Sequence, residues 1–124
     1  MPLIKASTAP SFEMSGLSVR GRAAPSLGSA ETCVWQITLA PGTPGTPHSI
    51  DREEIFVALS GEAHVEIDGA DQRVTPGDAL VVPAGRSFSL SNPGSVPFVA
   101  LALVPVGSQA MLPGGASFSP PWTI

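Results

Sequence analysis

The chain has 124 residues, of which 43% are hydrophobic, and a formal net charge of -4 at pH 7. A chain of this length supports one domain with one core rather than two. Its six basic residues are scattered without forming a basic run, which argues against nucleic acid as a partner.

Cysteine usage and hydropathy exclude further classes. Cys33 is the only cysteine, so neither a disulfide within the chain nor a cysteine cluster for zinc is expected. The first residues, MPLIKASTAPSF, lack the apolar run of a signal peptide, and no stretch approaches the ~18 apolar residues that span a membrane. We therefore expect a cytoplasmic protein with no membrane contact.

The first half of the chain consists of short apolar segments bounded by glycine or proline, which predict strands rather than helices. Residues 1–16 are expected to form an irregular N-terminal arm. The segment LSVRGRA is a candidate first strand, and EEIFVALSGEAHVEIDG is predicted to be a hairpin that turns at Ser60-Gly61. Between them, ETCVWQITLAPG is a stronger strand whose alternation puts four side chains on one face: Cys33, Trp35, Ile37 and Leu39.

The second half continues the pattern. QRVTPGDALVVPAG predicts two short strands around a Pro-Gly turn, and SFSLSNPGSVPFVALALVPVG predicts a hairpin around Asn92-Pro93-Gly94. About eight antiparallel strands over residues 17–107 predict a β-sandwich or barrel with little or no helix. Residues 108–124 are rich in proline and glycine but carry large apolar residues, so we expect an extended segment packed on the barrel or on a partner subunit, with a floppy end as the alternative. Those apolar residues are Met111, Leu112, Phe118 and Trp122.

Two spaced motifs lie within the predicted barrel. In GTPGTPHSIDREEIFVALSG, five residues separate Gly42 from His48, and one separates His48 from Ile50. Three residues then separate Ile50 from Glu54, and six separate Glu54 from Gly61. In GDALVVPAGRSFSLSN, five residues separate Gly77 from Pro83, and one separates Pro83 from Gly85. Two residues then separate Gly85 from Phe88, and three separate Phe88 from Asn92. Both stretches resemble the two motifs of the cupin family in every spacing. The resemblance implies an all-β jelly-roll barrel with one domain, often assembled as a homodimer.

The resemblance also implies a place for a metal, but the ligand set is incomplete. Typical cupins hold the ion with three histidines and a glutamate, and members usually have histidine where Ile50 and Phe88 stand. Only His48 and Glu54 remain, whereas catalytic zinc and non-haem iron sites commonly use three protein ligands. We therefore expect no metal cofactor. The alternative is one divalent ion (Fe, Mn, Ni or Zn) held by His48 and Glu54 and completed by water, by substrate or by Gln36.

Strand alternation predicts which side chains face the barrel interior. Across the expected hairpin Glu54 lies opposite Ile67, and cross-strand neighbours share a face. His64 then points outward to solvent, unless a one-residue bulge reverses the facing. The inward set is Glu54, Phe56, Ala58, Ala63, Val65 and Ile67.

His48 and Glu54 admit two interpretations if no metal is bound. They form a structural pair, joined by a hydrogen bond, or an acid–base pair whose proton affinities are shifted by an apolar pocket. Phe56 and Phe88 flank the former metal position, and Arg86, close to Phe88, is a candidate for holding an anionic ligand. The candidate ligand-binding residues are His48, Ile50, Glu54, Phe56, Phe88, Arg86 and Gln36.

Three functions follow from these features. The first is a metal-free cupin that binds a small molecule in an apolar pocket marked by His48 and Glu54. The second is an enzyme, either a metal-free isomerase, epimerase or cyclase that uses the same two residues or a metal-dependent dioxygenase with a reduced ligand set. The third is a structural role, with a barrel too full to admit a ligand. No motif selects a particular ligand.

Overall fold

Strands make up nearly all the regular structure in the computed structural model, which describes residues 1–124. The all-β prediction is confirmed, because the only helices are 3-10 turns of three residues each, and none is long and apolar enough to cross a membrane. The turns are η1 (Ala6–Thr8), η2 (Pro25–Leu27) and η3 (Pro121–Thr123). The strands are β1 (Ser11–Met14), β2 (Leu17–Ala23), β3 (Thr32–Leu39), β4 (Ser49–Ile50), β5 (Glu54–Ser60), β6 (Ala63–Ile67), β7 (Ala70–Val74), β8 (Ala79–Val82), β9 (Phe88–Ser91), β10 (Phe98–Pro105) and β11 (Ala110–Met111).

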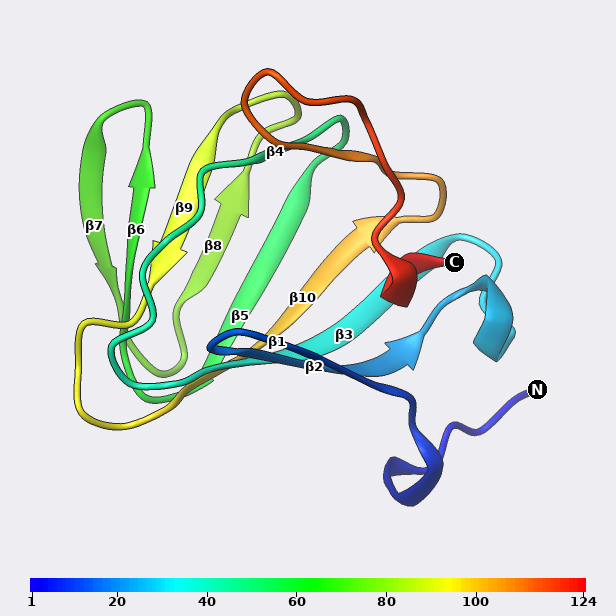
Figure 1. Cartoon of the computed structure of the whole chain (residues 1–124). Coiled ribbons are helices and arrows are strands. Elements are labelled where there is room, and N and C mark those ends of the chain that lie inside the picture. The colour runs from blue at the N-terminus through cyan, green and yellow to red at the C-terminus, as the bar shows by residue number, and fades with distance from the viewer.

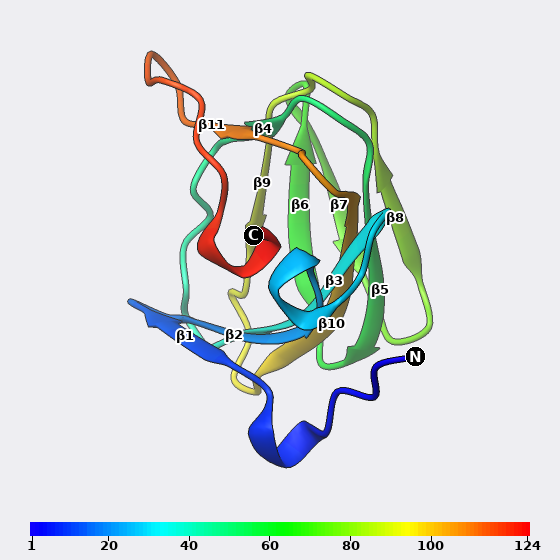
Figure 2. The same ribbon diagram turned by 90° about the vertical axis from the view of Figure 1, so that its right-hand side faces the viewer.

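Two antiparallel sheets form the walls of the barrel. One has six strands in the order β1-β2-β3-β10-β5-β8, and the other has three in the order β7-β6-β9. Figures 1 and 2 show the two sheets facing each other, with the small β11-β4 pair at one end. Buried and more exposed residues alternate along β10 and β3, so every second side chain of these strands enters the space between the sheets.

Two predicted hairpins are wrong. β5 pairs with β10 and β8, whereas β6 pairs with β7 and β9, so the turn at Gly61 carries the chain from one wall to the other. The same holds at Asn92, because β9 pairs with β6 while β10 pairs with β3 and β5. Turn residues specify that the chain reverses, but they do not specify that the flanking strands pair with each other.

The predicted facing nevertheless holds, because side-chain alternation along each strand does not depend on its partner. His64 lies on the outer side, where its Nδ1 is 3.6 Å from an Asp71 carboxylate oxygen. Ile67, at the end of β6, is only partly buried. The buried members of the predicted inward set are Glu54, Phe56, Ala58, Ala63 and Val65.

Both ends of the chain pack on the barrel. The N-terminal arm is not wholly irregular, because β1 pairs with β2 through the turn at Gly16. The C-terminal segment contributes β11, which pairs with β4, and η3, which carries Trp122. The Trp122 ring lies 5.9 Å from Phe12 and 6.2 Å from Trp35, measured between ring centroids. Figure 1 shows this last segment, in red, running across one end of the barrel.

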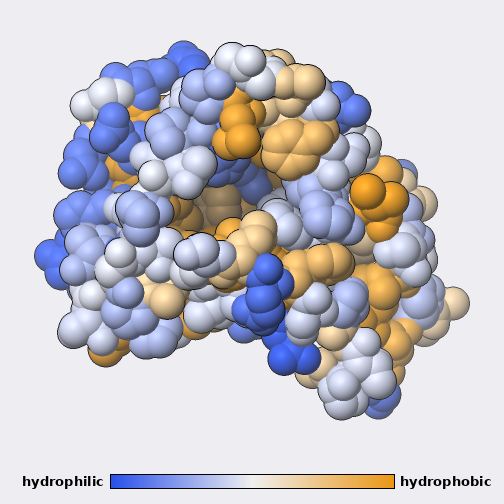
Figure 3. All heavy atoms as spheres, in the orientation of Figure 1, coloured by the Kyte–Doolittle hydropathy of each residue, from blue (hydrophilic) through white to orange (hydrophobic).

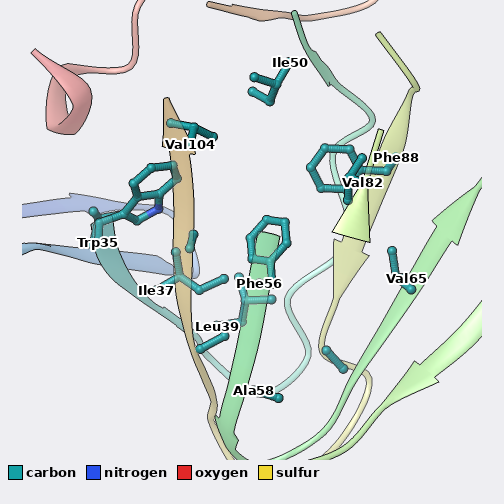
Figure 4. Packing of buried hydrophobic residues seen from close by; sticks show 14 of the residues in the cluster. Trp35, Ile37, Leu39, Ile50, Phe56, Ala58, Val65, Val82, Phe88 and Val104 are labelled. Carbon is teal, nitrogen blue, oxygen red and sulfur yellow. The ribbon is translucent and has the colours of Figure 1, made fainter. Parts of the chain in front are cut away.

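The hydrophobic core lies between the two walls. Figure 4 shows Phe56 from β5 and Phe88 from β9 approaching each other across it, with a centroid distance of 5.8 Å. At the corner after β9, buried Asn92 donates from Nδ2 to the carbonyl oxygens of Leu39 and Val96. Its Oδ1 accepts a hydrogen bond from the Gly94 amide. One side chain thus ties the corner to the opposite wall.

Gly61 is the position where the crossover between the walls is most sensitive to substitution. Its φ is +72°, and a Cβ there would lie 2.1 Å from the Pro97 carbonyl oxygen. Gly61→Ala is expected to lower the free energy of unfolding by about 2 kcal/mol or more beyond Gly69→Ala. Gly69 is the matched control, because its φ is +79° but a Cβ there meets nothing within 4 Å. Urea denaturation of both variants measures the difference, and equal losses would contradict this account of the turn.

Candidate functional site

A cavity opens between the two walls at the end covered by the C-terminal segment. It consists of two adjoining chambers of about 320 and 290 Å³. Figure 3 shows the molecule hollowed near the centre of this view, with hydrophobic residues inside. The residues that line both chambers are Met14, Leu17, Trp35, His48, Glu54 and Trp122.

Each chamber adds its own, mostly apolar wall. The first is lined by residues of β3, β5 and β9, including Ile37, Phe56 and Phe88. The second is lined by Ile50 from β4 and by the C-terminal segment, including Phe118. The cavity therefore places His48 and Glu54 as the two titratable side chains in an apolar surrounding. The structural alternative of a completely filled barrel is not supported.

Glu54, the first residue of β5, is the buried charge-bearing side chain of this cavity. It is 3% exposed, and its Oε1 is buried without a hydrogen-bond partner. Removal from water disfavours the ionised carboxylate, so burial raises the pKa of Glu54 from 4.5 to about 8. At neutral pH this carboxyl group is mostly protonated and able to donate a hydrogen bond.

Hydrogen bonds of its backbone and of its ring hold His48 in place. Its amide donates to the Phe88 carbonyl at 3.0 Å, and the Phe88 amide donates back at 2.9 Å. Its Nδ1 lies 2.9 Å from the Thr46 carbonyl oxygen. A carbonyl only accepts hydrogen bonds, so Nδ1 carries the hydrogen, and the neutral ring keeps its lone pair on Nε2. The His48 ring centroid lies 4.4 Å from that of Phe88, with the two ring planes tilted by 46°.

His48 and Glu54 are not joined by a hydrogen bond. The histidine bonds to Thr46, and one carboxyl oxygen of the glutamate has no partner. The expected hydrogen bond between His48 and Glu54 is therefore absent. The histidine ring bonds instead to a backbone carbonyl of the loop before β4. What remains is a proton acceptor and a protonated acid lining the same two chambers.

The residues present do not fit the four-ligand metal centre of typical cupins. Ile50 and Phe88 line the chambers but offer no donor atom, and no cluster of three or more His, Cys, Asp or Glu side chains exists in the chain. The absence of a resident metal stays a prediction from this donor set.

Two of the candidate ligand-binding residues lie away from the cavity. Gln36 is on the face of β3 opposite Trp35, where its Oε1 accepts a hydrogen bond from Arg22 at 3.1 Å. It therefore cannot complete a metal site there. Arg86 lies in the exposed loop before β9 and forms an ion pair with Asp68. Arg86 therefore does not share the inward face of Phe88, because the residues before β9 do not continue its alternation.

Sequence reasoning did not place Trp122 in the site. Its ring reaches the cavity from 68 residues after Glu54, through a segment whose local pattern is that of a tail. The only available signal was that this segment carries large apolar residues. Strand alternation put Trp35 on one face with Cys33, Ile37 and Leu39, but its contact with the cavity depends on the chamber that Trp122 helps to line.

A larger, open hollow of about 650 Å³ lies elsewhere, around the turn at Gly61 and the loop after Asn92. Its charged groups neutralise each other, because Arg73 donates to Glu62 through two nitrogens at 2.6 to 2.9 Å. This hollow is wide and solvated, and it has no unpartnered buried group. The cavity with Glu54 is therefore the better candidate site.

A profile of the cupin domain matches residues 35–104, which is more than half of the chain. The chain therefore belongs to the cupin family. Among solved structures it is similar to the polyketide cyclase RemF from Streptomyces resistomycificus, with a TM-score of 0.75 and 17% identity over 85% of this chain and 79% of that one. It is also similar to a sugar phosphate isomerase of the cupin superfamily from Silicibacter pomeroyi, with a TM-score of 0.72 and 18% identity over 90% of this chain and 81% of that one. These likenesses show the jelly-roll fold.

A curated relative matches over a shorter stretch. The mannose-1-phosphate guanylyltransferase 2 of Escherichia coli O157:H7 is 37% identical over 57 residues, which are 46% of this chain and 11% of that protein. The chain thus spans about a tenth of this relative's length. The match is a likeness of one domain.

Burial of Glu54 gives folding a pH dependence of known sign. The folded pKa, about 8, exceeds the unfolded one near 4.5, so the folded state binds more protons between these values. Stability is therefore highest below about pH 4.5, as far as this group is concerned, and falls as pH rises toward 8, with a slope approaching about 1.4 kcal/mol per pH unit. Urea denaturation from pH 5 to 8 should show this slope, and Glu54→Gln should flatten it. A slope unchanged in the variant would contradict the assignment.

Proposed function

We propose that this protein is a small-molecule-binding cupin without a resident metal, which holds a mainly apolar ligand in the cavity between its sheets. The observation that carries this proposal is the unpartnered carboxyl group of Glu54 at the meeting of the two chambers. A buried polar atom without a partner costs about 1–3 kcal/mol. A ligand that supplies the missing hydrogen bond recovers part of this cost, so the cavity favours occupancy.

The cavity also has the character of a binding site. Each chamber alone is about the size of the smallest ligand pockets of proteins, ~300 Å³, and the two adjoin. Its walls are apolar except for His48 and Glu54 and a few hydroxyl groups, which is the usual mixture of apolar contact and sparse polar orientation. The homodimer and the cytoplasmic location stay predictions.

The binding proposal is tested by titration with neutral apolar compounds. Trp35 and Trp122 are the only two tryptophans and both line the cavity, so their fluorescence reports entry. Borneol and 2-naphthol are the probes, and at least one is expected to bind at one molecule per chain. Ala110→Phe fills the second chamber and is expected to weaken binding about tenfold, because Ala110 is buried in that wall. If neither probe changes the fluorescence of the folded protein, the binding proposal fails.

A second candidate function is an enzyme that moves protons without a metal. It is favoured by one observation, namely that His48 offers a free Nε2 and Glu54 a carboxyl group to the same chambers. In such an isomerase, epimerase or cyclase, Nε2 accepts a proton from a carbon next to a carbonyl group. Glu54 donates its proton to the carbonyl oxygen. The raised pKa of Glu54 keeps that proton available near pH 7.

The enzyme alternative predicts proton exchange in a bound ketone. 2-Tetralone, a neutral ketone with acidic α-hydrogens, should exchange these hydrogens for deuterium in D₂O faster with the protein than without it, as measured by NMR. His48→Ala should slow this exchange by about 100-fold, because it removes the general base. His64→Ala is the matched control, since the other histidine lies on the outer side of β6. Equal exchange in both variants would leave binding as the function and exclude this role for His48.

A further inference from the structure

The lining of the cavity contains no cation. Neither chamber is lined by a lysine or an arginine. Three of the arginines donate hydrogen bonds elsewhere: Arg22 to Gln36, Arg73 to Glu62 and Arg86 to Asp68. An anionic group in the cavity would lose its hydration and gain no counter-charge, because no lysine or arginine lines either chamber. The site therefore disfavours phosphates and carboxylates.

The walls of the cavity are rich in aromatic rings. The chain has seven phenylalanines and tryptophans, and five of them line one or both chambers. Two of these rings stand on opposite walls, Phe56 on β5 and Phe88 on β9, and Trp122 closes the cavity from the C-terminal segment. Flat rings on several sides favour a flat aromatic guest, because stacked and edge-to-face contacts add to the area that is buried. The five lining rings are Trp35, Phe56, Phe88, Phe118 and Trp122.

Two buried polar atoms of residues in these walls have no hydrogen-bond partner. They are Oε1 of Glu54 and Nε1 of Trp122, and both residues line both chambers. Glu54 needs a group that can exchange a hydrogen bond with a carboxyl group, and Trp122 needs an acceptor. A ligand hydroxyl group supplies either role, because its oxygen accepts and its hydrogen donates.

We propose that the cavity takes a neutral, planar aromatic compound bearing a hydroxyl group, stacked between the aromatic walls and hydrogen-bonded to Glu54. This inference rests on the proposed binding function and narrows it to one class of ligand. It separates the site from one that recognises phosphorylated or carboxylated molecules. It also assigns Trp122, from the C-terminal segment, to the ligand-binding wall.

Three probes of matched skeleton test the two parts of the inference. 2-Naphthol is neutral and flat, 2-naphthoate is flat but anionic at neutral pH, and decahydro-2-naphthol has the same hydroxyl group on a saturated, puckered skeleton. Calorimetric titration at neutral pH is expected to show 2-naphthol binding at least about tenfold more tightly than either of the others. An anion that binds equally well overturns the preference for neutral ligands. A saturated alcohol that binds equally well overturns the preference for aromatic ligands.

The role of Glu54 is tested by a double comparison. In the native protein 2-naphthol should bind about tenfold more tightly than naphthalene, which lacks the hydroxyl group. In Glu54→Leu this ratio should fall toward one while naphthalene still binds, which shows that the cavity survives. A ratio unchanged in the variant overturns the assignment of Glu54 as the anchor.

The outcomes separate this inference from the binding proposal on which it rests. Binding of borneol or decahydro-2-naphthol without a preference for 2-naphthol leaves a small-molecule-binding cupin and removes its aromatic ligand class. Failure of every neutral probe, including naphthalene, removes both. Binding of the neutral probes together with still tighter binding of 2-naphthoate keeps the binding function and reverses the charge preference.

Discussion

Side-chain alternation on two facing sheets is the constraint on which the rest of this structure depends. Every second residue of each wall must enter a space that water does not fill, so that space accepts apolar side chains and tolerates few polar ones. Glu54 occupies an inward position and follows this rule only by holding its proton. Its neighbours in the alternation, Phe56 and Ala58, then set how dry its surroundings are. The shape of the barrel and the chemistry of its cavity thus have one origin.

The same alternation explains what the sequence could and could not predict. Facing depends on neighbouring residues in one strand, so the inward set from Glu54 to Val65 was predictable even though its supposed hairpin does not exist. Strand partners depend on contacts far apart in the chain, and the turns at Gly61 and Asn92 gave no sign that they join opposite walls. The contribution of Trp122 was hidden for the same reason. The hydrogen bond from Arg22 on β2 to Gln36 and the ion pair of Arg86 in its loop were equally invisible to local patterns.

The replacement of two histidines by Ile50 and Phe88 changes the kind of chemistry that the barrel supports. A cation held by several ligands requires those ligands to be deprotonated and gathered around one point. Here the two remaining polar side chains are not bonded to each other. The His48 ring hydrogen-bonds to the Thr46 carbonyl oxygen, and Oε1 of Glu54 has no partner. The apolar replacements raise the cost of charge in the cavity. They leave a site suited to hydrogen bonding and to the movement of protons between neutral groups.

The contact between Cys33 and the C-terminal segment links a thiol to the closure of the cavity. The Cys33 side chain is fully buried on β3, and its Sγ lies 3.5 Å from the Thr123 carbonyl oxygen in η3, next to Trp122. Burial also raises the pKa of this thiol, so little thiolate forms while the segment is in place. A thiol-specific reagent reacts only in the moments when Cys33 becomes accessible. Because the same segment walls the second chamber, the rate of alkylation follows how often that chamber opens to solvent, and a ligand that holds Trp122 in place slows it.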